Sequence, residues 1–401
     1  MLRRTWFAWA VAVGVAVTAA RTPAADDITR ALATIKTVSR EGKGNDAAGE
    51  AWKVLVAKGR AALLPALGAV DDANPTAANW LRTAADAIAE AEAKAGRTLP
   101  AVALEEFAKD TKFAPSARRH AYELHVGQNP GAKGRLLPQF LNDPSPDLRR
   151  DAVADELERL DRSAPDIAKA GLQKLFPFTR DKDQVDAVAK KIGERGGKAS
   201  VSEHFAFLTR WHLVGPFESE KGKALTTAYP PETAPDVTAA YKGKDGTALA
   251  WKAEATTDAY GMMDLNKLLG KHKNAAVYAL AVVTAGKETP AEIRVASPNA
   301  VQIFLNGKKL FEREEYHHGD ALDYHVGKGV LKAGDNTVVL KVCQNNQTDS
   351  WAQRWQFAAR VCDATGGPLA GLAQVVPGST PPKPIKLGTI PESATPTEEK
   401  K

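Results

Sequence analysis

The hydrophobic pattern of this 401-residue sequence changes its period near residues 197–203. Before that point alanine is abundant, and apolar residues recur at steps of three and four, the spacing of an amphipathic helix. After it, apolar and polar residues alternate in short runs between turn residues, the spacing of β-strands. The change predicts a multidomain α + β protein with a helical part followed by an antiparallel β-sandwich or jelly roll.

Composition and length place four segments along the chain. We expect a signal peptide at 1–24, a helical repeat domain at 26–197 and a β domain at 203–365. The last segment, 375–401, is rich in Pro, Thr and Lys and cannot bury a core, so we expect a disordered tail.

The first residues have the pattern of a secretory signal. Arg3-Arg4 precedes an apolar run from Trp6 to Ala20, and small residues at Val17–Ala19 or Thr22–Ala24 fit a cleavage site. The alternative is an uncleaved anchor, although the run is short for a membrane span. We expect a periplasmic or secreted protein with no membrane span after processing.

Charge and cysteine content narrow the classes of function. The formal net charge of +6 is weak and spread along the chain, which argues against nucleic-acid binding. Cys343 and Cys362 fall at the non-core positions of two strands close in sequence. Export would permit a disulfide between them, and the alternative is two half-buried thiols.

The helical part contains a weak internal repeat. Leu63–Leu67 is similar to Leu136–Phe140, Leu99–Val102 lies between them, and the prolines in these segments recur every 35–40 residues or so. This period predicts an α-solenoid of helix pairs, with an irregular helical bundle as the alternative. The segment Leu136–Leu157, LLPQFLNDPSPDLRRDAVADEL, resembles a HEAT repeat, and within it Ser145-Pro146 predicts the cap and first residue of a helix. Such stacks mostly make contact surfaces, so a protein partner is expected there.

The β part is organised around a hairpin at Val301–Phe311. Asn306-Gly307 lies between two apolar runs and tolerates the positive φ angles of a two-residue turn. A turn centred there places Ile303 opposite Leu310, and puts alternate residues from 301 to 305 on one buried face. Further strands are expected at Trp211–Phe217, Leu249–Lys252, Val277–Val283, Glu292–Ala296, Asn336–Val342 and Trp355–Val361. Alternation places Trp211 and Trp355 at core-facing positions, so we expect them to pack in the core.

Four segments of the β part resemble galactose-binding-like jelly-roll domains over about 205–363. They are Trp211–Phe217 (Trp-x-x-x-Gly-Pro-Phe), Ile303–Lys308, Leu331–Asn336 and Val338–Val342. The combined chain resembles exported bacterial proteins that join HEAT-type helices to such a domain. The resemblance implies carbohydrate binding, for example to a glycan or cell-envelope polysaccharide. The matching residues form turns and core strands, so they do not carry a ligand specificity.

The stretch Glu314–His325 has the most functional side chains in the chain. Tyr316, His317, Asp320, Asp323 and Tyr324 are the candidate ligand-binding residues. His318 and His325 lie in the same stretch, and Trp351 ends a second polar loop that begins at Gln344. Aromatic rings can stack on sugars, imidazole and carboxylate can bind a metal, and the whole stretch can equally be a polar loop packed on the sandwich.

A second group, Asp258, Asp264 and Asn266, brings oxygen ligands together around Gly261. Domains of the resembled type often carry a structural calcium, so a hard cation is one interpretation. The spacing does not match a calcium loop, and capping of a short helix by Asp264 is the other interpretation.

No enzyme signature is present. The sequence lacks the zinc-protease, nucleophile-elbow, phosphate-loop and dinucleotide motifs, and no cofactor is expected. We therefore expect a non-catalytic exported protein that joins a helical contact scaffold to a carbohydrate-binding β-sandwich. Two alternatives remain: a carbohydrate-active hydrolase, whose two carboxylates only the fold would bring together, and a purely protein-binding module.

Overall fold

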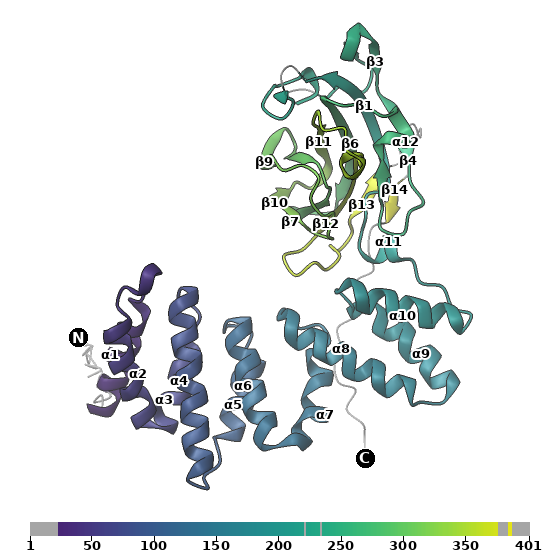
Figure 1. Cartoon of the computed structure of the whole chain (residues 1–401). Coiled ribbons are helices and arrows are strands. Elements are labelled where there is room, and N and C mark those ends of the chain that lie inside the picture. Colours follow the sequence, from purple (N-terminus) through teal and green to yellow (C-terminus); the bar gives the residue numbers. More distant parts are fainter. Residues whose placement is uncertain (1–22, 220–221, 233–234, 376–383, 387–401) are drawn as a thin grey trace, which may run out of the picture. The chain divides into compact units, whose positions relative to one another are not determined.

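The computed structural model describes residues 23–219, 222–232, 235–375 and 384–386 (Figure 1). The chain divides into two compact units, 1–135 and 136–401, which are described separately. Nearly all of the expected signal segment, 1–24, lies outside the described residues.

The described part of the first unit is helical. Its helices are α1 (Pro23–Lys36), α2 (Asn45–Lys58), α3 (Arg60–Gly68), α4 (Pro75–Lys94), α5 (Ala101–Lys109), α6 (Pro115–Gln128) and α7 (Lys133–Leu136), which ends one residue past the unit. Successive helices pack in pairs, α1 on α2, α3 on α4 and α5 on α6. Asn74 shows how the second member of a pair begins: its side chain accepts the backbone N–H groups of Thr76 (3.0 Å) and Ala77 (3.1 Å), and Pro75 takes the first helical position.

Four more helices open the second unit: α8 (Pro146–Asp161), α9 (Pro165–Leu175), α10 (Lys182–Glu194) and the single turn α11 (Val201–His204). Ser145 caps α8 and Pro146 is its first residue, as the sequence predicted. Leu160, Leu172 and Val188 are buried between α8, α9 and α10. The helical half is thus built of paired helices, and the predicted fold class is confirmed.

Residues 197–203, where the hydrophobic period changes, lie inside the second unit. Val185 of α10 is buried in one apolar cluster with Phe205 and Ala358, the last of which lies in a strand of the sandwich. Tyr260 donates a hydrogen bond to Asp186 of α10. The helices α8–α10 therefore belong to the same compact unit as the sheets.

The strands pair antiparallel throughout the described residues. They are β1 (Arg210–Glu218), β2 (Ala240–Lys242), β3 (Ala248–Ala250), β4 (Lys252–Ala255), β5 (Met263–Asp264), β6 (Ala275–Ala285), β7 (Thr289–Ala296), β8 (Ala300–Leu305), β9 (Lys308–Arg313), β10 (His325–Leu331), β11 (Gly334–Gln344), β12 (Gln356–Cys362), β13 (Ala373–Val375) and β14 (Pro384–Lys386). The short helix α12 (Leu265–Leu269) precedes β6.

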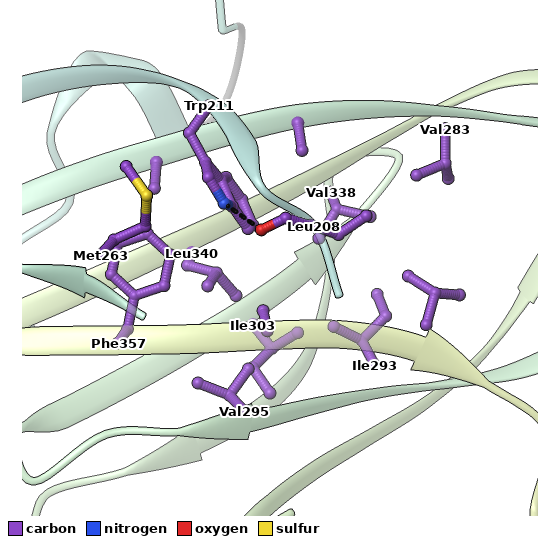
Figure 2. Packing of buried hydrophobic residues seen from close by; sticks show 14 of the residues in the cluster. Leu208, Trp211, Met263, Val283, Ile293, Val295, Ile303, Val338, Leu340 and Phe357 are labelled. Carbon is purple, nitrogen blue, oxygen red and sulfur yellow. Dashed lines mark hydrogen bonds between the residues drawn. The ribbon is translucent and has the colours of Figure 1, made fainter. Parts of the chain in front are cut away.

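Two of the sheets face each other. The larger has the order β14-β13-β6-β11-β8-β9, with β1 pairing with both β6 and β4, and the smaller has the order β10-β7-β12-β5. A third, two-stranded sheet joins β2 to β3. Alternate residues of both large sheets meet in one apolar core, including Ile303 and Leu340 from one sheet and Val295 and Phe357 from the other (Figure 2). The result is the sandwich that the sequence predicted.

Trp211 and Trp355 are fully buried in this core, which confirms their predicted packing role. Trp211 Nε1 donates a hydrogen bond to the carbonyl oxygen of Leu208 at 2.8 Å. The Trp211 ring lies edge-on to the Phe357 ring, with ring centroids 5.1 Å apart (Figure 2). The indole N–H is thereby satisfied inside an apolar environment, as burial of tryptophan requires.

The hairpin forms at Asn306-Gly307, whose φ angles are 51° and 78°. One detail of its register was wrong: Ile303 pairs with Phe311, not with Leu310. The register shifts between Ile303 and Phe304, so Leu310 is an additional residue on β9. A β-bulge of this kind cannot be read from the spacing of apolar residues alone.

Further elements differ from the sequence expectations. The strand predicted at Leu249–Lys252 is split between β3 and β4, and β2, β5, β10 and β13 were not predicted. β10 contains Gly327 and Gly329, which have no side chain to show alternation; a Cβ on Gly329 would lie 2.9 Å from Leu305. Within the expected tail, Pro384–Lys386 pairs with Ala373–Val375 as β14. None of the described helices is long and apolar enough to cross a membrane.

Candidate ligand-binding face of the sandwich

The connections β7–β8 (297–299), β9–β10 (314–324) and β11–β12 (345–355) each join the two sheets, and they leave the sandwich at the same end. In the larger sheet β8 pairs antiparallel with β9 and β11, and in the smaller sheet β7 pairs antiparallel with β10 and β12, so the strand ends that these connections join lie side by side. We call the second and third of these connections together the loop face. It contains every ligand-binding residue that the sequence nominated. Loops on a rigid sandwich are a common place for recognition.

Trp351 is the most exposed aromatic residue in the described chain, with 60% of its surface accessible. His317 lies against it edge-on, with ring centroids 5.4 Å apart. The position of His317 is fixed twice: its backbone N–H donates to the Pro298 carbonyl at 2.6 Å, and its Nε2 lies 2.7 Å from Asn345 Oδ1. Its φ of 58° lies in the left-handed region. Trp351 and His317 thus form a held aromatic contact that is open to solvent.

Tyr316 serves mainly in the packing of the sandwich. Its ring packs on the apolar cluster that covers the outer face of the larger sheet, next to Cys343. Burial raises the pKa of its hydroxyl above the ordinary value. Its place in this cluster leaves little of the ring for an outside partner, in contrast to the prediction that it contacts a ligand.

Asp320 joins the loop to the first residues of the smaller sheet. Its Oδ2 accepts hydrogen bonds from Arg354 Nη1 at 2.9 Å and Gln356 Nε2 at 2.7 Å. The Asp320–Arg354 pair is partly exposed. It can therefore offer both a donor and an acceptor to a polar ligand while it also holds the loop in place.

Asp323 is an anchor and not a free ligand-binding residue, which corrects the sequence-based role. It lies on the outer face of the smaller sheet, where Oδ1 accepts from Arg360 Nε at 2.7 Å and Oδ2 from Arg294 Nη1 at 2.8 Å. Burial opposes ionisation of this carboxyl group, but the two arginines outweigh it and hold its pKa below the usual value.

Tyr324 and His318 form the second half of the loop face, next to His325. Tyr324 is 39% exposed and stacks on His318 with centroids 4.5 Å apart, and its hydroxyl donates to Glu315 Oε2 at 3.1 Å. His325 is fully buried at the start of β10, and burial lowers its pKa to about 4. His325 is therefore neutral at pH 7.

The candidate calcium residues are used in local structure. Asp258 accepts two backbone N–H groups of its own turn, at 2.8 and 3.1 Å. Asp264 accepts the N–H of Lys267 at 3.1 Å and so caps α12, the second of the two interpretations. Asn266 donates to the Gln353 carbonyl at 2.7 Å. Among the described residues, no group of three His, Cys, Asp or Glu side chains is placed to hold a metal ion.

Cys343 and Cys362 are free, buried thiols, so the disulfide alternative is wrong. They lie in β11 and β12, strands of opposite sheets, and each points away from the shared core as the sequence pattern indicated. Two facing sheets are about 10 Å apart, and the outward direction separates the sulfurs further. Burial raises the pKa of Cys362 to about 11.

The carboxyl pKa values of the described sandwich bear on the alternative of a glycosidase. The acid of a glycosidase needs a raised pKa and a second carboxylate across the scissile bond. In the described sandwich, the carboxyl groups whose pKa departs clearly from the ordinary value are Asp236, Glu312 and Asp323, and all three pKa values are lowered.

The sequence did not identify the partners of the loop face, namely Asn345, Arg354, Arg294 and Arg360. Arg294 and Arg360 alternate with the core residues Ile293 and Val361, which is the pattern of a solvent-exposed charge. Asn345 lies in the polar loop that begins at Gln344, which was the only signal that the sequence contained.

No family model matches the chain, and no curated protein is similar to it in sequence. Solved structures with distant similarity include a β-glucosidase from Kluyveromyces marxianus in complex with glucose (12% identity, 38% of this chain and 16% of that chain, TM-score 0.25). A second is an anti-sigma factor domain-containing protein from Clostridium clariflavum (13% identity, 36% of this chain and 42% of that chain, TM-score 0.20). A third is the PA14 domain of an antifreeze protein (10% identity, 45% of this chain and 70% of that chain, TM-score 0.17). At these TM-scores the similarities carry no argument about function.

Proposed function

We propose that this is a non-catalytic, exported glycan-binding protein, in which the loop face of a galactose-binding-like sandwich contacts the sugar. The observation that carries the proposal is Trp351, an exposed tryptophan held by His317 beside polar groups that are themselves fixed. Sugars present an apolar face and a rim of hydroxyl groups, and the tryptophan ring and the Asp320–Arg354 pair match these two features.

The test uses the intact protein on a glycan array, followed by calorimetric titration with each glycan retained. Covering about 60 Å² of the Trp351 ring would contribute about 1.5 kcal/mol, so Trp351→Ala should weaken binding roughly tenfold. Val330→Ala is the matched control, because Val330 is also an exposed apolar residue of the sandwich and does not belong to the loop face. A wild-type protein that retains no glycan, or a Trp351→Ala variant with unchanged affinity, would refute the proposal.

The lowered carboxyl pKa values support binding without hydrolysis. A glycan retained on the loop face should be recovered intact after long incubation, as checked by mass spectrometry. Release of shorter sugars would instead support the alternative of a carbohydrate-active hydrolase.

The helical part supplies the second half of the proposal, a HEAT-type scaffold that contacts a partner protein. Exposed apolar side chains on its helices, Val102 of α5 and Ile167 of α9, support this role. Exchange of both for glutamate should reduce the size of the native complex in sedimentation. An unchanged size would contradict this part of the proposal and leave the glycan-binding part in place.

A further inference from the structure

His325 is a buried histidine that lies among other aromatic rings. Its side chain is fully buried, and neither ring nitrogen meets the geometry of a hydrogen bond. Three other rings lie around it. The distances between ring centroids are 4.9 Å to Tyr324 (edge-on), 5.4 Å to Phe311 of β9 and 5.5 Å to His318 (edge-on). A buried polar group without a partner is unusual and calls for an explanation.

The charged groups near this cluster come from two elements. Arg313 of β9 lies over the Tyr324 ring at 5.3 Å and pairs with Glu315 at 3.1 Å. Glu315 Oε2 is 4.0 Å from His318 Nε2, which is itself buried without a hydrogen bond. His318 and Arg313 disfavour a positive charge on His325, whereas Glu315 and the Ser297 backbone favour it. Desolvation by burial lowers the pKa of His325 more than any of these groups changes it, so His325 is neutral while the cluster is closed.

The cluster is joined to the proposed glycan contact through one segment. His317, which holds Trp351, directly precedes His318, which stacks in the cluster. The segment 314–319 has β9 on one side and the Asp320 anchor on the other. Loss of the His318 contacts would therefore loosen this segment while Asp320 and Asp323 keep the rest of the loop in place.

We propose that His318, Tyr324 and His325 form an acid-sensitive latch, which holds 314–319 closed at neutral pH and loosens it, with release of the glycan, on acidification. The ligand half of this statement rests on the proposed function, and the latch itself does not. When the segment opens, His325 becomes hydrated and protonates near its ordinary pKa of 6.5 instead of about 4. Linkage between these two values shifts the closed–open equilibrium toward open by about 20-fold between pH 7 and pH 5.

The latch is tested without any ligand by hydrogen–deuterium exchange of the intact protein at pH 7, 6 and 5, corrected for the intrinsic pH dependence. The opening constant of the amides in 315–319 should rise by about 20-fold from pH 7 to pH 5, while amides of the hairpin 301–311 remain protected. In His325→Phe, which keeps a buried ring but cannot take up a proton, the rise should disappear. His272→Phe, the same exchange at a histidine that contacts Trp355 at the edge, is the matched control and should keep the wild-type response.

Three results would overturn the latch: no rise in the wild type, an equal rise in the hairpin, or a rise that persists in His325→Phe. If His325→Phe does not fold, NMR titration of the wild-type histidines replaces it, and a His325 resonance that titrates near pH 6.5 with the loop closed would overturn the proposal. Glycan affinity at pH 7 tests the proposed function separately. A latch that responds to acid in a protein that binds no glycan would leave this inference standing and remove only its ligand.

Discussion

Lys341 gives the sharpest test of how the sandwich is stabilised. It lies on the outward side of β11, yet its side chain has no exposed surface. Its ammonium group donates three hydrogen bonds, to the carbonyl oxygens of Leu225 (2.9 Å) and Thr227 (2.6 Å) and to Glu232 Oε1 (2.6 Å). Tyr278 donates to the same carboxylate oxygen. The segment 222–232 is therefore held to the larger sheet by a buried charge.

Lys341→Met keeps the aliphatic stem and removes the charge. It leaves the nearly buried Glu232 carboxylate without its counter-ion and two carbonyl groups without a donor. Removal of one partner from a buried pair costs about 3–5 kcal/mol. For a unit of this size each kcal/mol lowers the melting temperature by about 2–4 °C, so we expect a decrease of about 6–20 °C.

The assay is thermal and urea unfolding of the intact chain, followed by tryptophan fluorescence, to which the buried Trp211 and Trp355 contribute. Lys328→Met is the matched control, because Lys328 is 78% exposed and lies 3.4 Å from Glu292, a geometry that contributes at most about 1 kcal/mol. The double variant Lys341→Met/Glu232→Gln should lose less than the sum of the single variants, since each removes the same interaction. If Lys341→Met lowers the free energy of unfolding no more than Lys328→Met does, the cost of burying Lys341 and Glu232 equals their attraction, and the reasoning is wrong.

Three more predictions follow from local geometry. Burial lowers the pKa of His204 to about 4, so the unfolded chain takes up a proton there that the folded chain excludes. The free energy of unfolding that is lost between pH 7 and pH 5 should therefore be about 2 kcal/mol smaller in His204→Phe than in the wild type, as measured by urea unfolding. Asn306→Val should lower stability by about 1–3 kcal/mol, because a β-branched residue resists the φ of 51° and the Asn306 side chain also accepts the Thr337 N–H at 2.9 Å; an unchanged unfolding midpoint would contradict this. N-terminal sequencing of the native protein should begin after Ala19 or Ala24, and an intact Met1 would contradict export.

The sequence predicted those features that depend on neighbouring residues. Asn306-Gly307 carries its own turn preference, and Ser145-Pro146 carries its own helix start, so both were placed correctly. Alternation within single strands likewise placed Trp211 in the core. Each of these rests on contacts within a few residues along the chain.

Features that depend on distant segments were not predictable in this way. The environment of Lys341 comes from 222–232, more than 100 residues earlier, and that of Asp323 comes from Arg294 and Arg360 on two other strands. Alternation marks all of these positions only as outward-facing. It does not indicate whether water or another segment of the chain covers them, so an anchor such as Asp323 resembles a ligand-binding residue in the sequence.

The same distinction explains why Trp351 remains the best candidate for recognition. Segments outside the strands cover part of both outer faces of the sandwich, and buried ions hold them there: Lys341 on the larger sheet, Arg360 and Asp323 on the smaller. Such pairs fix position strongly because breaking one leaves an uncompensated charge. They anchor one end of loop 314–324 through Asp323 and leave its other end, around His317, held by a hydrogen bond to Asn345, by ring contacts and by the partly exposed Arg313–Glu315 pair. Trp351 packs against that end, and in the proposed latch protonation of His325 would reach it through the contact between His325 and His318.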